Sequence, residues 1–209
     1  HTTDMLVKLA KEISPNPSSR EMDMLLSTGE GVSIALLAMA LQAQGCNAVS
    51  MNAMQVGIFT EKIHSKARIL EIKTDRIIQH LENDEVVVIA GFQGITEDME
   101  IPTLGRGGSD TSAVALAGAL GAKRCDIYTD VEGVYTTDPR IVPCASKLKE
   151  ISYEEMMELA YGGANVLHPR AVETAMKYNA PVRVRSTFKT DDLGTLILGV
   201  EKMELHKPV

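Results

Sequence analysis

Apolar residues recur along the chain with the spacing of helices in some stretches and of strands in others. Ser18 and Glu21 form a capping box ahead of apolar positions at helical spacing, which predicts a helix beginning there. A second apolar set over 34–41 has the same spacing and follows two glycines, so we predict a separate helix. Because this longest apolar run stops at Gln42, we expect no segment that spans a bilayer.

Strands alternate with the predicted helices along the rest of the chain. Strands are predicted over 46–51, 68–72, 86–90, 125–129 and 182–185. Further helices are predicted over 74–81, 112–120 and 170–178, and after a second capping box at 152–155. The run 86–90 is continuously apolar, as in a parallel strand covered on both faces, and 95–104 is predicted to form a hairpin or lid. We therefore predict an α/β fold, a three-layer α/β/α sandwich with a mainly parallel central sheet.

Composition and charge exclude several classes of protein. The chain has 209 residues, 44% of them hydrophobic, which is enough for one globular domain. Its net charge of -7 disfavours nucleic acid and anionic membranes as partners. The three cysteines and five histidines do not fall in a metal-ligand spacing, so we predict no metal site in the protein and a cytoplasmic location.

The most informative stretch for chemistry is rich in glycine and lies between a predicted hairpin and a predicted helix. It reads Gly105-Arg106-Gly107-Gly108-Ser109-Asp110-Thr111. Its three glycines can turn successive backbone N–H groups toward an anion, and the helix that follows adds the positive end of its dipole. A turn without function does not explain a guanidinium, two hydroxyls and a carboxylate in so short a stretch, so we predict a phosphate site.

Two common nucleotide-binding motifs do not fit these glycines. A P-loop requires a lysine after the last glycine, and a dinucleotide fingerprint requires glycine where Asp110 stands. Asp130 nevertheless lies at about the distance expected for a ribose-binding acid. A dehydrogenase therefore remains an open alternative.

A second polar cluster follows the strand predicted over 125–129. It consists of Thr129, Asp130, Tyr135, Asp138 and Arg140. An aromatic ring can cover adenine and a guanidinium can face phosphates, but a solvated turn is an equal alternative. Glu30, between two glycines, is interpreted by itself as a surface cap.

Three stretches, in this order, resemble the aspartokinases of the amino acid kinase family. They are Gly105–Thr111, Thr129–Arg140 and Val166–Pro169, and Thr2–Asp4 and Ser27–Glu30 also fit. The similarity covers nearly the whole chain. It implies an enzyme that uses ATP and Mg²⁺ to phosphorylate the side-chain carboxylate of L-aspartate to 4-phospho-L-aspartate, the first step of lysine, threonine and methionine biosynthesis.

The resemblance also implies roles for individual residues. The positions implied to hold aspartate are Thr3, Glu30, Arg106, Ser109 and Asp110. Arg106 would pair with the α-carboxylate and Glu30 with the ammonium, and Arg106 and Asp110 would act in catalysis. The positions implied to hold ATP are Gly107, Gly108, Ser109, Thr129, Asp130, Tyr135, Asp138, Arg140 and Asn165. Some relatives have lysine in place of Asn165.

The chain departs from the family at both ends. The family carries a catalytic lysine in a Lys-Phe-Gly-Gly segment on its first strand, and these 209 residues contain no such segment, so we expect them to lack that strand and that group. We expect a catalytic domain over 1–200, and over 201–209 the start of a linker to absent ACT regulatory domains. Homodimers are common in the family, so a homodimer or a higher oligomer is expected.

Two further alternatives stay open beside an aspartate kinase. One is a kinase of the same fold that acts on glutamate, acetylglutamate, carbamate or UMP. The other is a nucleotide-binding regulatory module without turnover.

Overall fold

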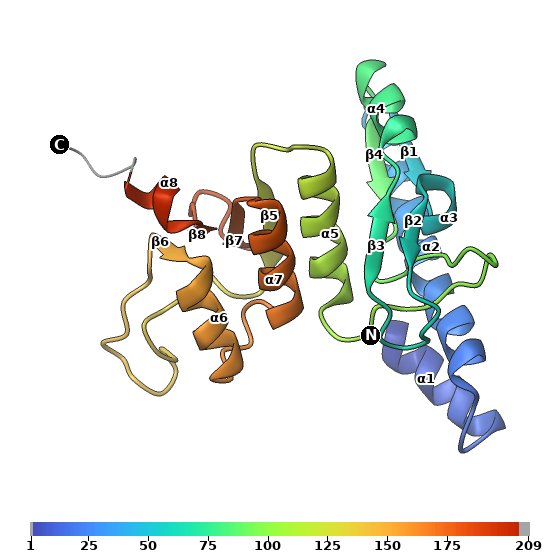
Figure 1. The fold of residues 1–209 in the computed structure, drawn as a ribbon, viewed down its shortest axis with the longest axis horizontal. Coiled ribbons are helices and arrows are strands. Elements are labelled where there is room, and N and C mark those ends of the chain that lie inside the picture. Colours follow the sequence, from blue (N-terminus) through green and yellow to red (C-terminus); the bar gives the residue numbers. More distant parts are fainter. Residues whose placement is uncertain (1, 205–209) are drawn as a thin grey trace. The chain divides into compact units, whose positions relative to one another are not determined.

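The computed structural model describes residues 2–204 (Figure 1). The chain divides into two compact units, His1–Ser112 and Ala113–Val209. Unit 1 contains α1 (Thr2–Ile13), α2 (Ser19–Ala43), β1 (Ala48–Met51), α3 (Ala53–Val56), β2 (Ile58–Thr60), β3 (Ile69–Ile72), α4 (Asp75–Glu82) and β4 (Val86–Ile89). Helix α5 (Gly108–Ala119) begins in unit 1 and continues into unit 2.

Unit 1 has two small sheets. Strands β1 and β4 pair in parallel with Ala48 opposite Val86, and β2 and β3 pair antiparallel with Ile58 opposite Ile72. The predicted hairpin after β4 is confirmed, because Gly94 N donates to Pro102 O and Gln93 pairs antiparallel with Thr103. This hairpin leads directly into the glycine-rich stretch.

Helix α2 is one continuous helix of 25 residues, so the prediction of two separate helices was wrong. Its start is as predicted, since the Ser18 side chain accepts a hydrogen bond from Glu21 N at 3.3 Å. A glycine inside a helix costs about 1 kcal/mol relative to alanine, which made a break plausible from sequence. At Gly29, however, an added Cβ would lie 3.3 Å from Thr2 Cγ2, so this glycine lets α1 pack closely on α2.

The continuity of α2 also affects whether the chain has a helix long enough to span a membrane. By length and composition alone, α2 is the one helix in residues 2–204 that is long and apolar enough to cross a bilayer, a candidate that the sequence analysis did not identify because it divided this helix in two. Core helices and signal sequences near an N-terminus pass the same test, which makes this weak evidence for a membrane. In the structure α2 packs against α1, β1 and β4.

Strand β4 is parallel as predicted but is not covered on both faces. Val86 is 45% exposed, and the other three residues of the strand are half-buried. Within the described part of the chain β4 pairs with β1 alone. The continuous β-branched run therefore predicted the strand correctly. It did not predict how deeply the strand is buried, because burial depends on the neighbouring strands and helices.

Unit 2 is built on one four-stranded sheet. Its elements are β5 (Cys125–Thr129), β6 (Glu150–Ser152), α6 (Tyr153–Tyr161), α7 (Pro169–Tyr178), β7 (Val182–Ser186), β8 (Thr195–Leu198) and α8 (Val200–Glu204). The strand order is β5-β7-β8-β6, with β5–β7 and β6–β8 parallel and β7–β8 antiparallel. Helices α6 and α7 pack against each other, and their buried residues share one core with the sheet.

Local signals placed helices α6 and α7 of unit 2. The second predicted capping box is present, with Ser152 accepting from Glu155 N while the Glu155 side chain accepts from Ser152 N. Pro169 occupies the first turn of α7, as predicted, and the His168 side chain caps that helix. Three of the five strand pairings in the described residues are parallel, and the predicted α/β fold with a mainly parallel sheet is confirmed.

Candidate functional site

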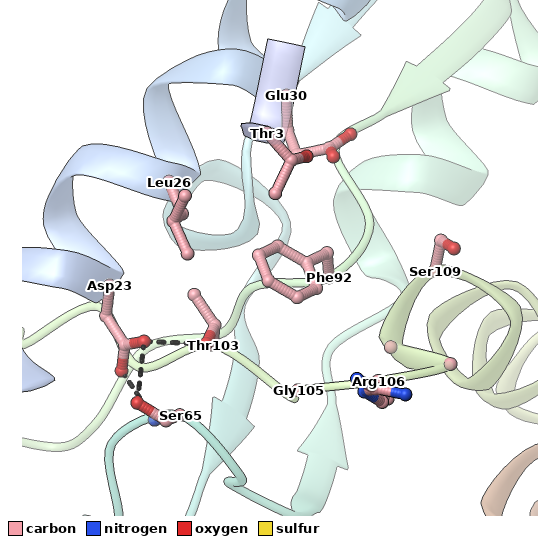
Figure 2. A pocket seen from close by; sticks show the side chains of 12 residues that line it. Thr3, Asp23, Leu26, Glu30, Ser65, Phe92, Thr103, Gly105, Arg106 and Ser109 are labelled. Carbon is pink, nitrogen blue, oxygen red and sulfur yellow. Dashed lines mark hydrogen bonds between the residues drawn. The ribbon is translucent and has the colours of Figure 1, made fainter. Parts of the chain in front are cut away.

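Unit 1 contains a pocket of about 400 Å³ beside the glycine-rich stretch (Figure 2). Its lining residues are Thr3, Asp23, Leu26, Glu30, Ser65, Phe92, Thr103, Gly105, Arg106, Gly107, Gly108 and Ser109. They come from α1, α2, the β2–β3 loop, the segments on both sides of the hairpin, and the start of α5. The pocket therefore joins positions more than a hundred residues apart in sequence.

Helix α2 contributes three of these residues from one face. Asp23, Leu26 and Glu30 are spaced by three and four, and side chains with that spacing lie above one another on a helix. Glu30 stands inside the helix and is half-buried, so its interpretation as a surface cap was wrong. No partner for its carboxylate occurs within residues 2–204, and burial raises the pKa of Glu30 above its usual value because desolvation disfavours the charged form.

The glycine-rich stretch adopts the left-handed conformations that glycine permits. Gly105 has φ +76° and Gly107 has φ +67°, and a Cβ at Gly105 would lie 2.6 Å from the Ser65 carbonyl oxygen. Gly108 starts α5, and its N–H donates to Gly105 O at 3.0 Å. The prediction that all three glycines offer their N–H groups to an anion was therefore wrong for Gly108.

The two charged residues of this stretch are placed differently. Arg106 lines the pocket, is exposed, and forms no ion pair with any described residue. Asp110 lies in the first turn of α5, where a carboxylate is favourable next to the helix dipole, and is not among the lining residues. Ser109, one residue earlier, does line the pocket.

Phe92 is held in a conformation that is rare for residues other than glycine. Its φ is +67°, which costs on the order of 1–2 kcal/mol for a side chain with a Cβ. The backbone is fixed on both sides, since Phe92 N donates to Ser112 Oγ at 3.0 Å and Leu104 N donates to Phe92 O at 2.8 Å. Figure 2 shows the ring among the other lining side chains, so Phe92 gives the pocket an apolar surface.

The residues predicted to hold ATP after position 112 lie in unit 2. Thr129 ends β5 and donates from Oγ1 to Asp130 at 3.1 Å. Arg140 donates to Asp138 with an Nη2–Oδ2 distance of 2.8 Å, and this contact holds the pKa of Asp138 below its usual value. To bind a phosphate, Arg140 would therefore have to weaken or break its ion pair with Asp138.

Tyr135 and Asn165 complete the predicted set. Tyr135 is half-buried and its backbone pairs with Lys147, which fixes the loop after β5. Asn165 is exposed in the connection between α6 and α7.

Sequence reasoning missed part of the pocket. Asp23, Leu26, Ser65 and Thr103 line it and were not singled out. The spacing of Asp23 and Leu26 to Glu30 was a usable signal, but only once α2 is known to be one helix. Ser65 and Thr103 carry no local signal, because the chain brings them together through long-range pairing.

Comparison with known proteins identifies the family. A model of the amino acid kinase family matches residues 1–186. The chain belongs to the amino acid kinase family.

Members of this family with high identity are aspartokinases. The chain is 61% identical over 205 residues to the aspartokinase of Geobacillus stearothermophilus, covering 98% of this chain and 50% of that protein. The crystal structure of the aspartate kinase from Synechocystis has a TM-score of 0.82 and 56% identity, covering 95% of this chain and 32% of that one. The predicted resemblance to aspartokinases is confirmed.

A third relative was solved with small molecules bound. The structure of E. coli aspartokinase III in complex with aspartate and ADP has a TM-score of 0.83 and 34% identity, covering 94% of this chain and 44% of that one. The present chain thus spans about half the length of the Geobacillus and E. coli relatives and about a third of the Synechocystis chain.

Membership of the amino acid kinase family bears on how a metal ion could be bound. Within residues 2–204, no three His, Cys, Asp or Glu side chains gather so as to hold an ion. A divalent cation in a kinase of this family can instead be held mainly by the phosphates of the nucleotide and by water.

Proposed function

We propose that this chain supplies the aspartate- and ATP-binding part of an aspartate kinase, which transfers the γ-phosphoryl group of ATP to the β-carboxylate of L-aspartate. The observation that carries the proposal is the pocket that joins Thr3, Glu30, Arg106 and Ser109. It offers a guanidinium for the α-carboxylate and a carboxylate for the ammonium, which is the charge pattern of an amino acid. The identity to aspartokinases supports this assignment.

The chemistry that these residues have to support is mainly electrostatic. A β-carboxylate is ionised at neutral pH, so it needs no general base to act as the nucleophile. The difficulty is to bring two anions together in line, which requires positive charge and oriented N–H groups at the transferred phosphoryl group. The N-terminal turn of α5 is suited to that task.

We assign ATP to the positions of unit 2 named above together with the glycine-rich stretch, and Mg²⁺ to the phosphates of the bound nucleotide. The product, 4-phospho-L-aspartate, is the first intermediate on the way to lysine, threonine and methionine. We further propose that residues 1–200 form the catalytic part, that the enzyme is cytoplasmic, and that it forms a homodimer or a higher oligomer. Exposed apolar side chains of α2, namely Val32, Leu36, Leu37 and Met39, support association.

The decisive test is product trapping in the complete gene product that carries these residues. With ATP, Mg²⁺ and aspartate, we expect aspartate-dependent ADP release and an acyl phosphate that hydroxylamine converts to a hydroxamate. ADP release with glutamate, acetylglutamate, carbamate or UMP instead of aspartate would favour another kinase of the family. ATP binding without turnover on any of them would favour the regulatory module.

The raised pKa of Glu30 leads to a prediction about pH. Since the ionised carboxylate is needed to hold an ammonium, aspartate affinity should rise as the pH increases through this pKa and then level off. The contribution of Glu30 to the stability of the free protein should change in the opposite direction: the folded state keeps a proton that the unfolded state has released, so this contribution falls as the pH increases from the usual pKa of a glutamate to the raised one. Calorimetric titration of aspartate across acidic to neutral pH measures the first trend, and thermal unfolding measures the second.

The control for this prediction is a pair of matched variants. Glu30→Gln should remove the pH dependence that Glu30 contributes, whereas Glu82→Gln, at an exposed position at the end of α4, should leave both trends unchanged. Identical affinity profiles for Glu30→Gln and the wild type would contradict a role of Glu30 in holding the ammonium.

A further inference from the structure

A buried acid lies at the edge of the pocket, next to the glycine-rich stretch. Asp23, on α2, is only 1% exposed, although charged side chains are rarely buried without partners. It lines the pocket seven residues before Glu30, on the same face of the helix. The resemblance to aspartokinases assigned it no role.

The carboxylate of Asp23 is surrounded by donors from two other segments. Thr103 Oγ1 donates to it at 2.6 Å, Ser65 N at 2.8 Å, and His64 Nδ1 lies 2.9 Å away. The backbone N–H of Ser65 and the hydroxyl of Thr103 thus use two of the accepting sites of this carboxyl group, and the His64 ring lies against a third. Figure 2 shows the contacts of Asp23 to Ser65 and Thr103.

These contacts join three parts of unit 1 that are far apart in sequence. They hold α2 to the β2–β3 loop through His64 and Ser65, and to the segment before Gly105 through Thr103. The loop and that segment are also paired directly, since Ala67 N donates to Thr103 O at 3.0 Å. Asp23 is the common acceptor of this network.

The network reaches Arg106 through backbone packing. Ser65 has φ +65°, an uncommon conformation for serine, and its backbone N–H donates a hydrogen bond to the Asp23 carboxylate. The Ser65 carbonyl oxygen in turn lies so close to Gly105 that an added Cβ there would be only 2.6 Å away. Since Arg106 follows Gly105, a shift of Ser65 would move the guanidinium.

The hydrogen bonds distinguish Asp23 from the other acid in the pocket. Asp23 already accepts from several donors, so it has little capacity left for a ligand, whereas Glu30 has no partner within residues 2–204. We propose that Asp23 is a positioning residue: it fixes the β2–β3 loop and Thr103 so that Gly105 and Arg106 are held where they can bind the carboxylate of the amino-acid substrate. This inference rests on the proposed function, because it assigns Asp23 to the binding of aspartate.

The test compares aspartate and ATP affinities, measured by calorimetry on the complete gene product, with thermal unfolding as a check on folding. Asp23→Asn replaces one accepting oxygen by an NH₂ group, which would face the N–H and hydroxyl donors of Ser65 and Thr103. We therefore expect the affinity for aspartate to fall about tenfold and the affinity for ATP to change less than about twofold. Asp75→Asn, at an exposed position in the first turn of α4, is the matched control and should change neither affinity.

A second pair keeps the test valid if Asp23→Asn does not fold. Thr103→Val removes one donor and retains the shape, and should weaken aspartate binding about fivefold, whereas Thr103→Ser keeps the hydroxyl and most of the affinity. A merely structural role would lower stability without separating aspartate from ATP, and without rescue by serine.

The outcomes separate the two proposals. If the wild-type protein binds no aspartate, the proposed function fails and this inference fails with it. If the wild type binds aspartate but folded Asp23→Asn and Thr103→Val bind it equally well, only the positioning role of Asp23 is overturned. Equal losses of affinity for aspartate and ATP would also overturn it.

Discussion

Replacing Arg106 by alanine is expected to weaken aspartate binding by about 100-fold, the value for two charge-assisted hydrogen bonds to a carboxylate. Arg106 lines the pocket and has no ion pair within residues 2–204, so its charge is available to a ligand. Its position at the entrance to α5 places that charge beside the positive end of the helix dipole. Calorimetry with aspartate, followed by steady-state kinetics in the complete gene product, measures the effect.

Two further arginine variants make the Arg106 result specific. Arg106→Lys keeps the charge but not the planar fork, so it should recover only part of the affinity. Arg76→Ala removes an exposed arginine of α4 that does not line the pocket, and it should bind aspartate as the wild type does. Wild-type affinity in Arg106→Ala would show that the glycine-rich stretch does not bind the amino acid.

Replacing Gly194 by alanine is expected to destabilise the protein by about 3 kcal/mol, from steric overlap and from an unfavourable left-handed φ. Gly194 has φ +69°, and a Cβ there would lie only 1.9 Å from the Val184 carbonyl oxygen. The clash is with backbone, so no side chain can rotate away, and β8 would have to separate from β7.

The residue after Gly194 shows why that separation is costly. Thr195 is fully buried, pairs with Val184 across β7 and β8, and its Oγ1 donates to Leu148 O at 2.6 Å and accepts from Val134 N at 2.9 Å. Moving it would leave buried polar groups without partners.

Denaturant-induced unfolding measures the change, and Gly31→Ala is the matched control. A Cβ at Gly31 would meet no atom within 4 Å, and the residue is helical, so alanine there should stabilise the protein by about 0.5–1 kcal/mol. Unchanged stability of Gly194→Ala would mean that the β7–β8 turn can adopt another conformation.

The two acids of α2 illustrate how one helix face can serve two purposes. Glu30 has no partner among the described residues and is available to an ammonium, whereas Asp23 is occupied by donors from other segments. Both lie on the same face because their separation is close to two helical turns. Binding and positioning are thus separated by the hydrogen bonds of the surroundings rather than by residue type.

Local sequence signals determined much of the fold of this protein. Capping residues and the period of apolar positions placed the starts of α2, α6 and α7 and the strand β5, because these signals act within a few residues. The glycine-rich stretch was also recognisable, since the left-handed φ at Gly105 favours glycine and a Cβ there would lie 2.6 Å from the Ser65 carbonyl oxygen. The site residues assigned by resemblance to aspartokinases, among them Thr3 and Ser109, depended on motif order rather than on local physics.

Only the tertiary structure decided the rest. Whether Gly29 ends a helix depended on the packing of α1 against it, and whether β4 is buried depended on which strands and helices adjoin it. The role of Asp23 depended on Ser65 and Thr103, which approach it through hydrogen bonds that span 42 and 80 positions of the chain. Contacts of this kind leave no periodic pattern in the sequence, because they arise where separate elements meet, and so the buried acid beside the pocket became visible only in three dimensions.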